Sequence, residues 1–151
     1  MMRYQDLLGT AVIAGLSMAA GPSGAKAEDE PTKTPSFDEL LNALLGGNDV
    51  TVTVDLAQCT GGNPASPGMR IEGGFHIKSF IVPDRKLVAF SDVHSTIDKQ
   101  GKPLTEYLQY RVSPDGKTDI RHTTTTTDPW SIISTYNYAC EIGKGVNFVW
   151  R

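Results

Sequence analysis

The sequence of 151 residues has few of the side chains and motifs on which most enzymes depend. It holds three histidines and two cysteines, and it contains no C-x-x-C, G-x-S-x-G, G-x-G-x-x-G or P-loop motif. No two histidines have the i, i+4 spacing of a helical zinc site. These absences argue against a serine hydrolase, a dithiol oxidoreductase, a phosphate-cradling loop and a zincin-type protease.

The sequence has one long uncharged apolar run, at 7–20, which is shorter than the roughly 20 residues that span a bilayer. Arg3 precedes this run, and Ala25-Lys26-Ala27 has the A-x-A pattern of a secretory cleavage site. We therefore predict a signal peptide over 1–27, the alternatives being an uncleaved anchor or a buried N-terminal helix. The mature chain is predicted to be periplasmic or secreted, with no stable membrane insertion.

The chain also lacks an excess of positive charge. It has 14 Lys and Arg against 17 Asp and Glu, a formal net charge of −3. Loss of 1–27 removes two positive charges and one negative charge, so the mature chain carries −4. The basic residues are scattered among predicted turns and form no stripe. Nucleic acid and anionic membrane surfaces are excluded as natural partners on this ground.

Cys59 and Cys140 are the two cysteines. In an exported chain a single pair indicates one disulfide. A reactive thiol is the alternative, but neither cysteine has a basic neighbour in sequence that would lower its pKa. We predict that the pair is structural.

The mature chain is long enough for one domain with a core of its own. Residues 28–35 are acidic and poor in apolar side chains, which indicates a flexible leader, and 36–151 form the domain. Ser36 and Glu39 have the spacing of a capping box, and Gly46-Gly47 can end a helix. The intervening apolar side chains repeat with helical periodicity: Phe37, Leu40, Leu41, Leu44 and Leu45.

The rest of the domain alternates between apolar and polar residues, with short Gly, Pro and Asp turns between runs. The strongest turn signal is Ser113-Pro-Asp-Gly116. Short connections make neighbouring strands antiparallel. We predict an α+β, mostly β domain, with one N-terminal amphipathic helix and a roughly seven-strand antiparallel meander that is curled or barrel-like. The expected strands span 50–56, 69–82, 86–97, 104–112, 117–127, 134–142 and 146–150.

The best candidate for chemistry is Asp92 with His94, because alternation places both on one face of a strand. His76 lies on the strand that we expect to pair with theirs, and His122 on a nearby strand. The candidate binding surface is Asp92, His94 and His76. A metal site of His76, Asp92, His94 and His122 is the alternative, and a plain His–Asp hydrogen bond is the structural explanation. Asp92 and Glu106 on adjacent strands would be too common a pair to indicate a glycosidase.

Several strand motifs, in order, resemble the VirK family. They are VDLAQC at 54–59, GGFHI at 73–77, FSDVHST at 90–96, EYLQYRVSPDG at 106–116 and YACEIGKGVNFVW at 138–150. The family comprises small exported proteins of plant-associated and other alphaproteobacteria and is named from the Agrobacterium virulence regulon. By position, Cys59 and Cys140 match its cysteines, and Asp92 and His94 match its strand motif.

The resemblance implies a periplasmic or secreted protein associated with virulence or host interaction, with no catalytic residues to carry over. We expect a non-enzymatic protein without a cofactor that binds a small ligand or an envelope or host protein. The alternative is a small metal-dependent protein or enzyme that uses Asp92, His94 and a further histidine.

Overall fold

The computed structural model describes residues 33–62 and 71–151. The predicted signal peptide, most of the leader and most of the glycine-containing loop after Cys59 lie outside the described residues. No helix within the described ranges is both long and apolar enough to cross a membrane.

Helix α1 (Phe37–Leu45) begins and ends as the sequence predicts. The Glu39 amide donates to the Ser36 hydroxyl (3.2 Å), and the Ser36 amide donates to the Glu39 carboxylate (2.7 Å). Hydrogen bonds from the Lys33 ammonium and from Ser36 lower the pKa of Glu39 from 4.5 to about 2. Four leucine or phenylalanine side chains of the predicted face are buried, whereas Leu45 is exposed.

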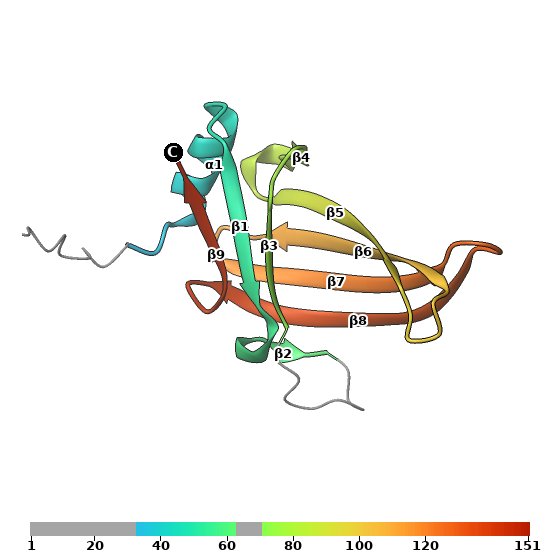
Figure 1. Cartoon of the computed structure of the whole chain (residues 1–151). Helices are drawn as coiled ribbons and strands as arrows, with labels where there is room; N and C mark the ends of the chain where they lie inside the picture. Colours follow the sequence, from blue (N-terminus) through green and yellow to red (C-terminus); the bar gives the residue numbers. More distant parts are fainter. Residues whose placement is uncertain (1–32, 63–70) are drawn as a thin grey trace, which may run out of the picture. The chain divides into compact units, whose positions relative to one another are not determined.

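The described residues form a single sheet of nine strands (Figure 1). The strands are β1 (Val50–Asp55), β2 (Thr60–Gly61), β3 (Glu72–His76), β4 (Phe80–Ile81), β5 (Val88–Ile97), β6 (Pro103–Val112), β7 (Lys117–Thr126), β8 (Ser131–Ile142) and β9 (Gly145–Trp150), with short 3-10 turns at Leu56–Gln58 and Pro83–Arg85. The order is β3-β1-β9-β8-β7-β6-β5-β4, with β2 paired to β8. The sheet curls into a half-barrel. The mostly β fold with one helix is confirmed.

The predicted meander covers β4 to β8, which are neighbours in sequence and in the sheet. The first strand lies elsewhere, between β3 and β9, and the predicted strand at 69–82 is split in two. Its first half, β3, pairs with β1, and its second half, β4, pairs with β5. Residues 77–79 lie between β3 and β4 and let the chain pass from one part of the sheet to the other, while the Ile77 amide still donates to the Val50 carbonyl at 2.9 Å.

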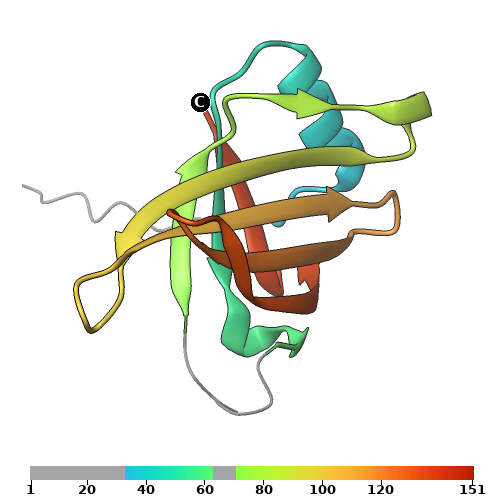
Figure 2. The same cartoon turned by 90° about the vertical axis from the view of Figure 1, so that its right-hand side faces the viewer.

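The core lies where β1, β3 and β9 cross the long strands β5–β8 under α1 (Figures 1 and 2). The rings of Phe90 and Tyr110 stack at 4.9 Å, and Phe75 of β3 and Phe148 of β9 contact this pair at 5.4 and 6.2 Å. Aromatic side chains from both parts of the sheet therefore fill the interior. Burial raises the pKa of the Tyr110 hydroxyl above its usual range, and the Asp92 carboxylate nearby raises it further.

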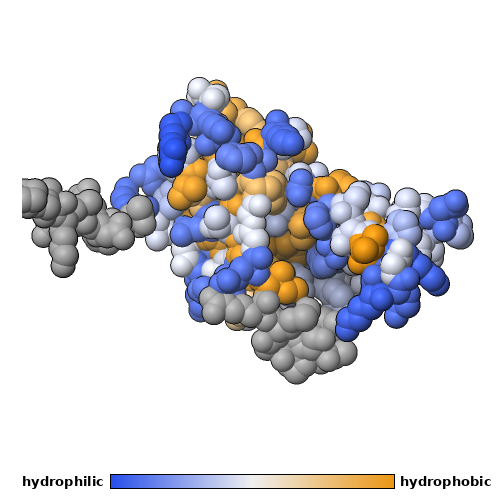
Figure 3. All heavy atoms as spheres, viewed as in Figure 1, coloured by the Kyte–Doolittle hydropathy of each residue, from blue (hydrophilic) through white to orange (hydrophobic). Residues whose placement is uncertain are grey.

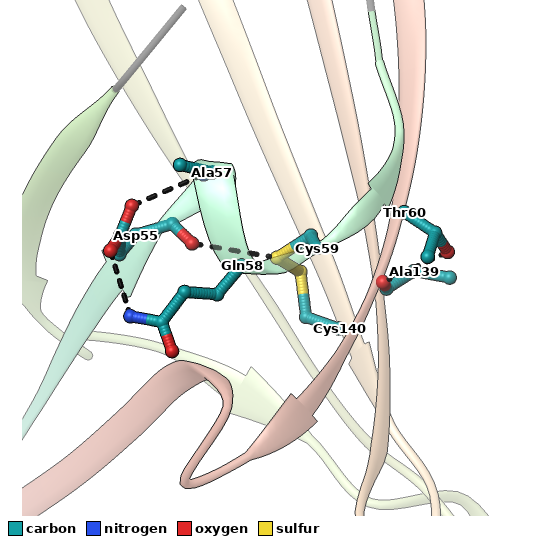
Figure 4. The surroundings of a disulfide bond; sticks show 7 residues. All are labelled: Asp55, Ala57, Gln58, Cys59, Thr60, Ala139 and Cys140. Carbon is teal, nitrogen blue, oxygen red and sulfur yellow. Dashed lines mark hydrogen bonds between the residues drawn. A yellow bond between two sulfur atoms is a disulfide. The ribbon is translucent and has the colours of Figure 1, made fainter. Parts of the chain in front are cut away.

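Cys59 and Cys140 form the predicted disulfide (Figure 4). Alternation alone would turn Cys59 away from Val50 and Val52, but the strand ends at Asp55 and a 3-10 turn follows. The Asp55 carboxylate caps this turn by accepting from the Ala57 amide at 3.1 Å. A Cβ on Gly145 would lie 2.5 Å from the Cys59 sulfur, so only glycine lets the start of β9 pass so close to the disulfide.

Candidate functional site

Strands β5–β8 pair in a register that aligns their side chains in rows across the sheet. One row, on the core face, contains Phe90, Tyr110, Ile120 and Tyr138. Two further rows continue this face beyond the core, and we call them the inner strip: Asp92, Leu108, His122 and Tyr136, then His94, Glu106, Thr124 and Ser134. The inner strip therefore combines acids, histidines and hydroxyls.

Asp92 and His94 lie on this strip, opposite Leu108 and Glu106 respectively. Asp92 is half-buried and His94 is exposed. In the view of Figure 3 apolar residues gather near α1 and in a central hollow, while hydrophilic residues cover much of the remaining surface. Asp92 and His94 follow the buried Phe90 on the same face of β5, so they lie between the apolar interior and solvent.

His122 and Glu106 are neighbouring titratable groups on the inner strip. The His122 Nε2 lies 3.6 Å from the Glu106 Oε1, with side chains 17% and 30% exposed. The Nε2 atom is buried and has no hydrogen-bond partner among the described residues. The pair is well placed for an ionic contact when His122 is protonated, yet it lacks the geometry of a hydrogen bond.

His76 does not join this group. The prediction that its strand pairs with that of Asp92 and His94 is wrong, because His76 belongs to β3, which pairs with β1. The His76 Nδ1 lies within hydrogen-bonding distance of the Asp49 carboxylate and the Thr51 hydroxyl, each at 3.1 Å. The structure thus brings together Asp92, His94 and His122 on one face and leaves His76 elsewhere.

A metal site formed by these histidines and Asp92 was the alternative prediction. Within the described ranges, no group of three or more His, Cys, Asp or Glu side chains is arranged to hold a metal ion. The cysteines are joined in the disulfide and provide no thiolate.

The opposite face of the long strands carries a groove of about 780 Å³, which we call the outer groove. It crosses the strands from β4 to β2, and in Figure 2 these two short strands lie above and below β5–β8. Its floor consists of two rows of outward side chains. The first row is Ile81, Ala89, Arg111, Asp119 and Ala139, and the second is Ser79, Ser91, Gln109, Arg121 and Asn137. Its volume is within the usual range of small-molecule sites, about 300–1,000 Å³.

Arg111 and Arg121 give the outer groove its charge. The register sets Arg111 opposite Asp119 and Arg121 opposite Gln109, so the two arginines are diagonal neighbours, roughly 7–8 Å apart at Cα. Neither guanidinium forms an ion pair or a side-chain hydrogen bond with any described residue. Asp119 is the one acid among the described residues of the lining. The groove is therefore basic in a chain whose net charge is −3.

The sequence held a signal for this groove that composition does not reveal. The turn at Ser113–Gly116 fixes the register of the β6–β7 hairpin, and that register places Arg111 and Arg121 on one face. Counting outward from the turn would have placed Arg111 opposite Asp119 and Arg121 opposite Gln109, which makes the arginines diagonal neighbours. The walls of the groove, formed by β2 and β4, depend on distant pairing and leave no local signal.

The fold and the groove define a class of protein, a small disulfide-linked half-barrel with one helix and an open polar groove. The chain belongs to the VirK family, whose model, described as VirK protein, matches residues 33–130. An uncharacterized protein of Sinorhizobium fredii is 35% identical over 83% of this chain and 88% of its own length. An uncharacterized protein of Rhizobium radiobacter is 32% identical over 75% of this chain and 79% of its own.

A solved structure shares the fold. A VirK family protein from Legionella pneumophila superposes with a TM-score of 0.69 at 21% identity, covering 77% of this chain and 97% of that one. At this identity the likeness is one of architecture.

Proposed function

We propose that this chain is an exported, non-enzymatic protein that binds a small anionic ligand in the outer groove and, as its family resemblance implies, acts in virulence or host interaction. The signal-type N-terminus and the disulfide support export, which fractionation of cells into cytosol, periplasm and medium would test. Among the described residues, the lining of the groove holds no histidine or cysteine, the side chains that most often activate a hydroxyl or act as a thiol nucleophile.

The observation that carries the proposal is the pair of arginines without ionic partners. Guanidinium groups bind carboxylate, sulfonate and phosphate groups through paired N–H donors. The diagonal spacing of Arg111 and Arg121 lets both reach one anion, and the amides of Gln109 and Asn137 beside them can donate further hydrogen bonds. An anion in this groove would balance the positive charge that Asp119 leaves uncompensated.

Citrate is the probe for this prediction, measured by titration calorimetry on the oxidised mature chain. We expect saturable binding at one site that weakens with added salt. Replacing Arg121 by Gln removes one charge-assisted contact and should weaken citrate binding about tenfold, which corresponds to about 1.4 kcal/mol. Arg111→Gln should have a similar effect.

Lys99→Gln is the matched control, because it removes one positive charge from an exposed turn outside the groove. It should leave citrate affinity within about twofold. Equal losses in all three variants would mean that citrate responds to net charge alone, and absence of saturable binding would refute the proposal.

The inner strip is the second candidate contact region. The buried His122 Nε2 without a hydrogen-bond partner, beside Glu106, favours it because such an atom is costly unless it meets a partner or ligand. We propose that Asp92 and His94 form its exposed edge. If Asp92→Ala combined with His94→Ala leaves folding and the virulence-linked phenotype unchanged, this surface has no such role. Metal analysis of the purified protein tests the metal-dependent alternative.

A further inference from the structure

An apolar surface adjoins the outer groove on the same face of the sheet. Val93 and Tyr107 lie opposite each other on β5 and β6, two residues beyond Ser91 and before Gln109, and they form the next row. Val93 is 55% exposed and Tyr107 is 36% exposed. Ile97 follows on the same face of β5 and is also exposed. The groove thus opens onto an apolar shelf, formed by Val93 and Tyr107, and Ile97 lies two rows further along, beyond Ser95.

Further exposed apolar side chains, Trp130, Ile132 and Ile133, lie where β7 passes into β8, at the same end of the long strands. Isolated exposed apolar residues are ordinary, whereas a contiguous apolar patch marks a binding surface. The described chain places no side chain over Val93 or Ile97 that would bury them.

The charge of the two arginines and their distance from the apolar shelf indicate which kind of molecule would bind here. Residues two apart along a strand are separated by roughly 7 Å, so the row of Val93 and Tyr107 lies about that far from the row of Gln109 and Arg121. A molecule with its acid group at the arginines and a body of one or two rings, or a short aliphatic chain, would reach the shelf. A purely polar anion would leave the shelf uncovered.

Building on the proposed function, we infer that the ligand of the outer groove is an amphipathic organic anion. Its carboxylate, sulfonate or phosphate group is held by Arg111 and Arg121, and its apolar body covers Val93 and Tyr107. The groove volume of about 780 Å³ suits a small molecule of this kind.

Two fluorescent probes separate the contributions of charge and apolar contact. The first is 1-anilinonaphthalene-8-sulfonate, and the second is N-phenyl-1-naphthylamine, which has the same rings without the sulfonate. On the oxidised mature chain we expect saturable binding of the sulfonate at one site, at least tenfold tighter than the neutral amine. Citrate should displace it, and Arg121→Gln should weaken it about tenfold while barely affecting the amine.

Removing the shelf should weaken the sulfonate probe and spare citrate. Val93→Ser with Tyr107→Ser changes exposed side chains and should weaken the sulfonate probe about tenfold, with citrate affinity unchanged. Val149→Ser, which removes an exposed apolar side chain on β9, is the matched control and should change neither. Circular dichroism confirms that each variant is folded.

The outcomes separate the two proposals. If citrate binds in an arginine-dependent manner but the shelf variant binds the sulfonate as tightly as the unmodified chain does, the amphipathic ligand is wrong and the anion site stands. If the sulfonate binds no more tightly than the neutral amine, or citrate fails to displace it, the inference is also overturned. If neither citrate nor the sulfonate binds saturably, both the anion site and the amphipathic ligand are wrong.

Discussion

Two fully buried threonines on β7, Thr118 and Thr125, differ in the hydrogen bonding of their hydroxyl groups. The Thr125 hydroxyl donates to the Thr105 carbonyl at 3.3 Å, whereas the Thr118 hydroxyl has no hydrogen-bond partner among the described residues. Thr118 aligns with Val88, Val112 and Cys140 in a buried row across the sheet. The Thr118 methyl group packs with these apolar side chains, whereas its hydroxyl group is buried among them without a hydrogen bond.

Thr118→Val should therefore stabilise the protein. The change keeps the shape of the side chain and the preference for a strand, and it removes a buried polar atom that lacks a hydrogen bond. We expect the free energy of unfolding to rise by about 1 kcal/mol in urea titrations. Thr125→Val, which removes a satisfied hydroxyl, should lower it by about 1 kcal/mol. A loss of stability in Thr118→Val would show that its hydroxyl is satisfied.

The sequence predicted the role of a residue well where that role depends on contacts with residues close by in the sequence. The capping box of Ser36 and Glu39 is confirmed because its partners are three residues apart. The disulfide partners were identified by elimination, since the chain has one pair of cysteines. His76 was misplaced because its surroundings depend on which strand β3 meets, and no local pattern encodes that choice.

At the scale of elements, the disulfide joins the 3-10 turn after β1 to β8 across 81 residues of sequence. Next to it, Thr60 and Gly61 pair with Ala139 and Tyr138, so β2 is held at one end of the outer groove (Figure 4). The disulfide therefore stabilises the fold and also fixes one wall of the candidate site.

Replacing both cysteines by alanine should strongly destabilise the domain. Opening a loop of this length lowers the free energy of unfolding by at most roughly 4–5 kcal/mol on the chain-entropy model, a large part of the 5–15 kcal/mol typical of a domain. Urea unfolding should show this loss, and the dithiothreitol-reduced natural chain should match the variant. Equal stability of the oxidised and reduced chains would contradict the account.

Elements that connect over short turns were predictable, and those that pair over long distances were not. The hairpins from β4 to β8 follow turn signals such as Ser113–Gly116, and α1 follows its own periodicity. The placement of β1 between β3 and β9 brings together segments far apart in sequence. Hydrophobic alternation specifies which face of β1 is buried but not which strands lie beside it.

At the scale of the whole domain, the two faces of β5–β8 have different chemistry beyond the core. The inner strip carries Asp92, His94, Glu106 and His122, and was partly identified from sequence. The outer groove carries two arginines and adjoins an apolar shelf, and it was not foreseen because each arginine alone resembles an ordinary surface residue. The inner strip carries two acids, whereas the outer groove carries two arginines and one acid, so an anion suits the outer groove better.

Nuclear magnetic resonance of the side chains during a citrate titration reports binding on each face of β5–β8 separately, so it distinguishes the outer groove from the inner strip. We predict saturable shifts of the Arg111 and Arg121 Nε–H signals, with the imidazole signals of His94 and His122 unchanged. Shifts of the imidazole signals with unmoved arginine signals would place binding on the inner strip and overturn the assignment to the outer groove.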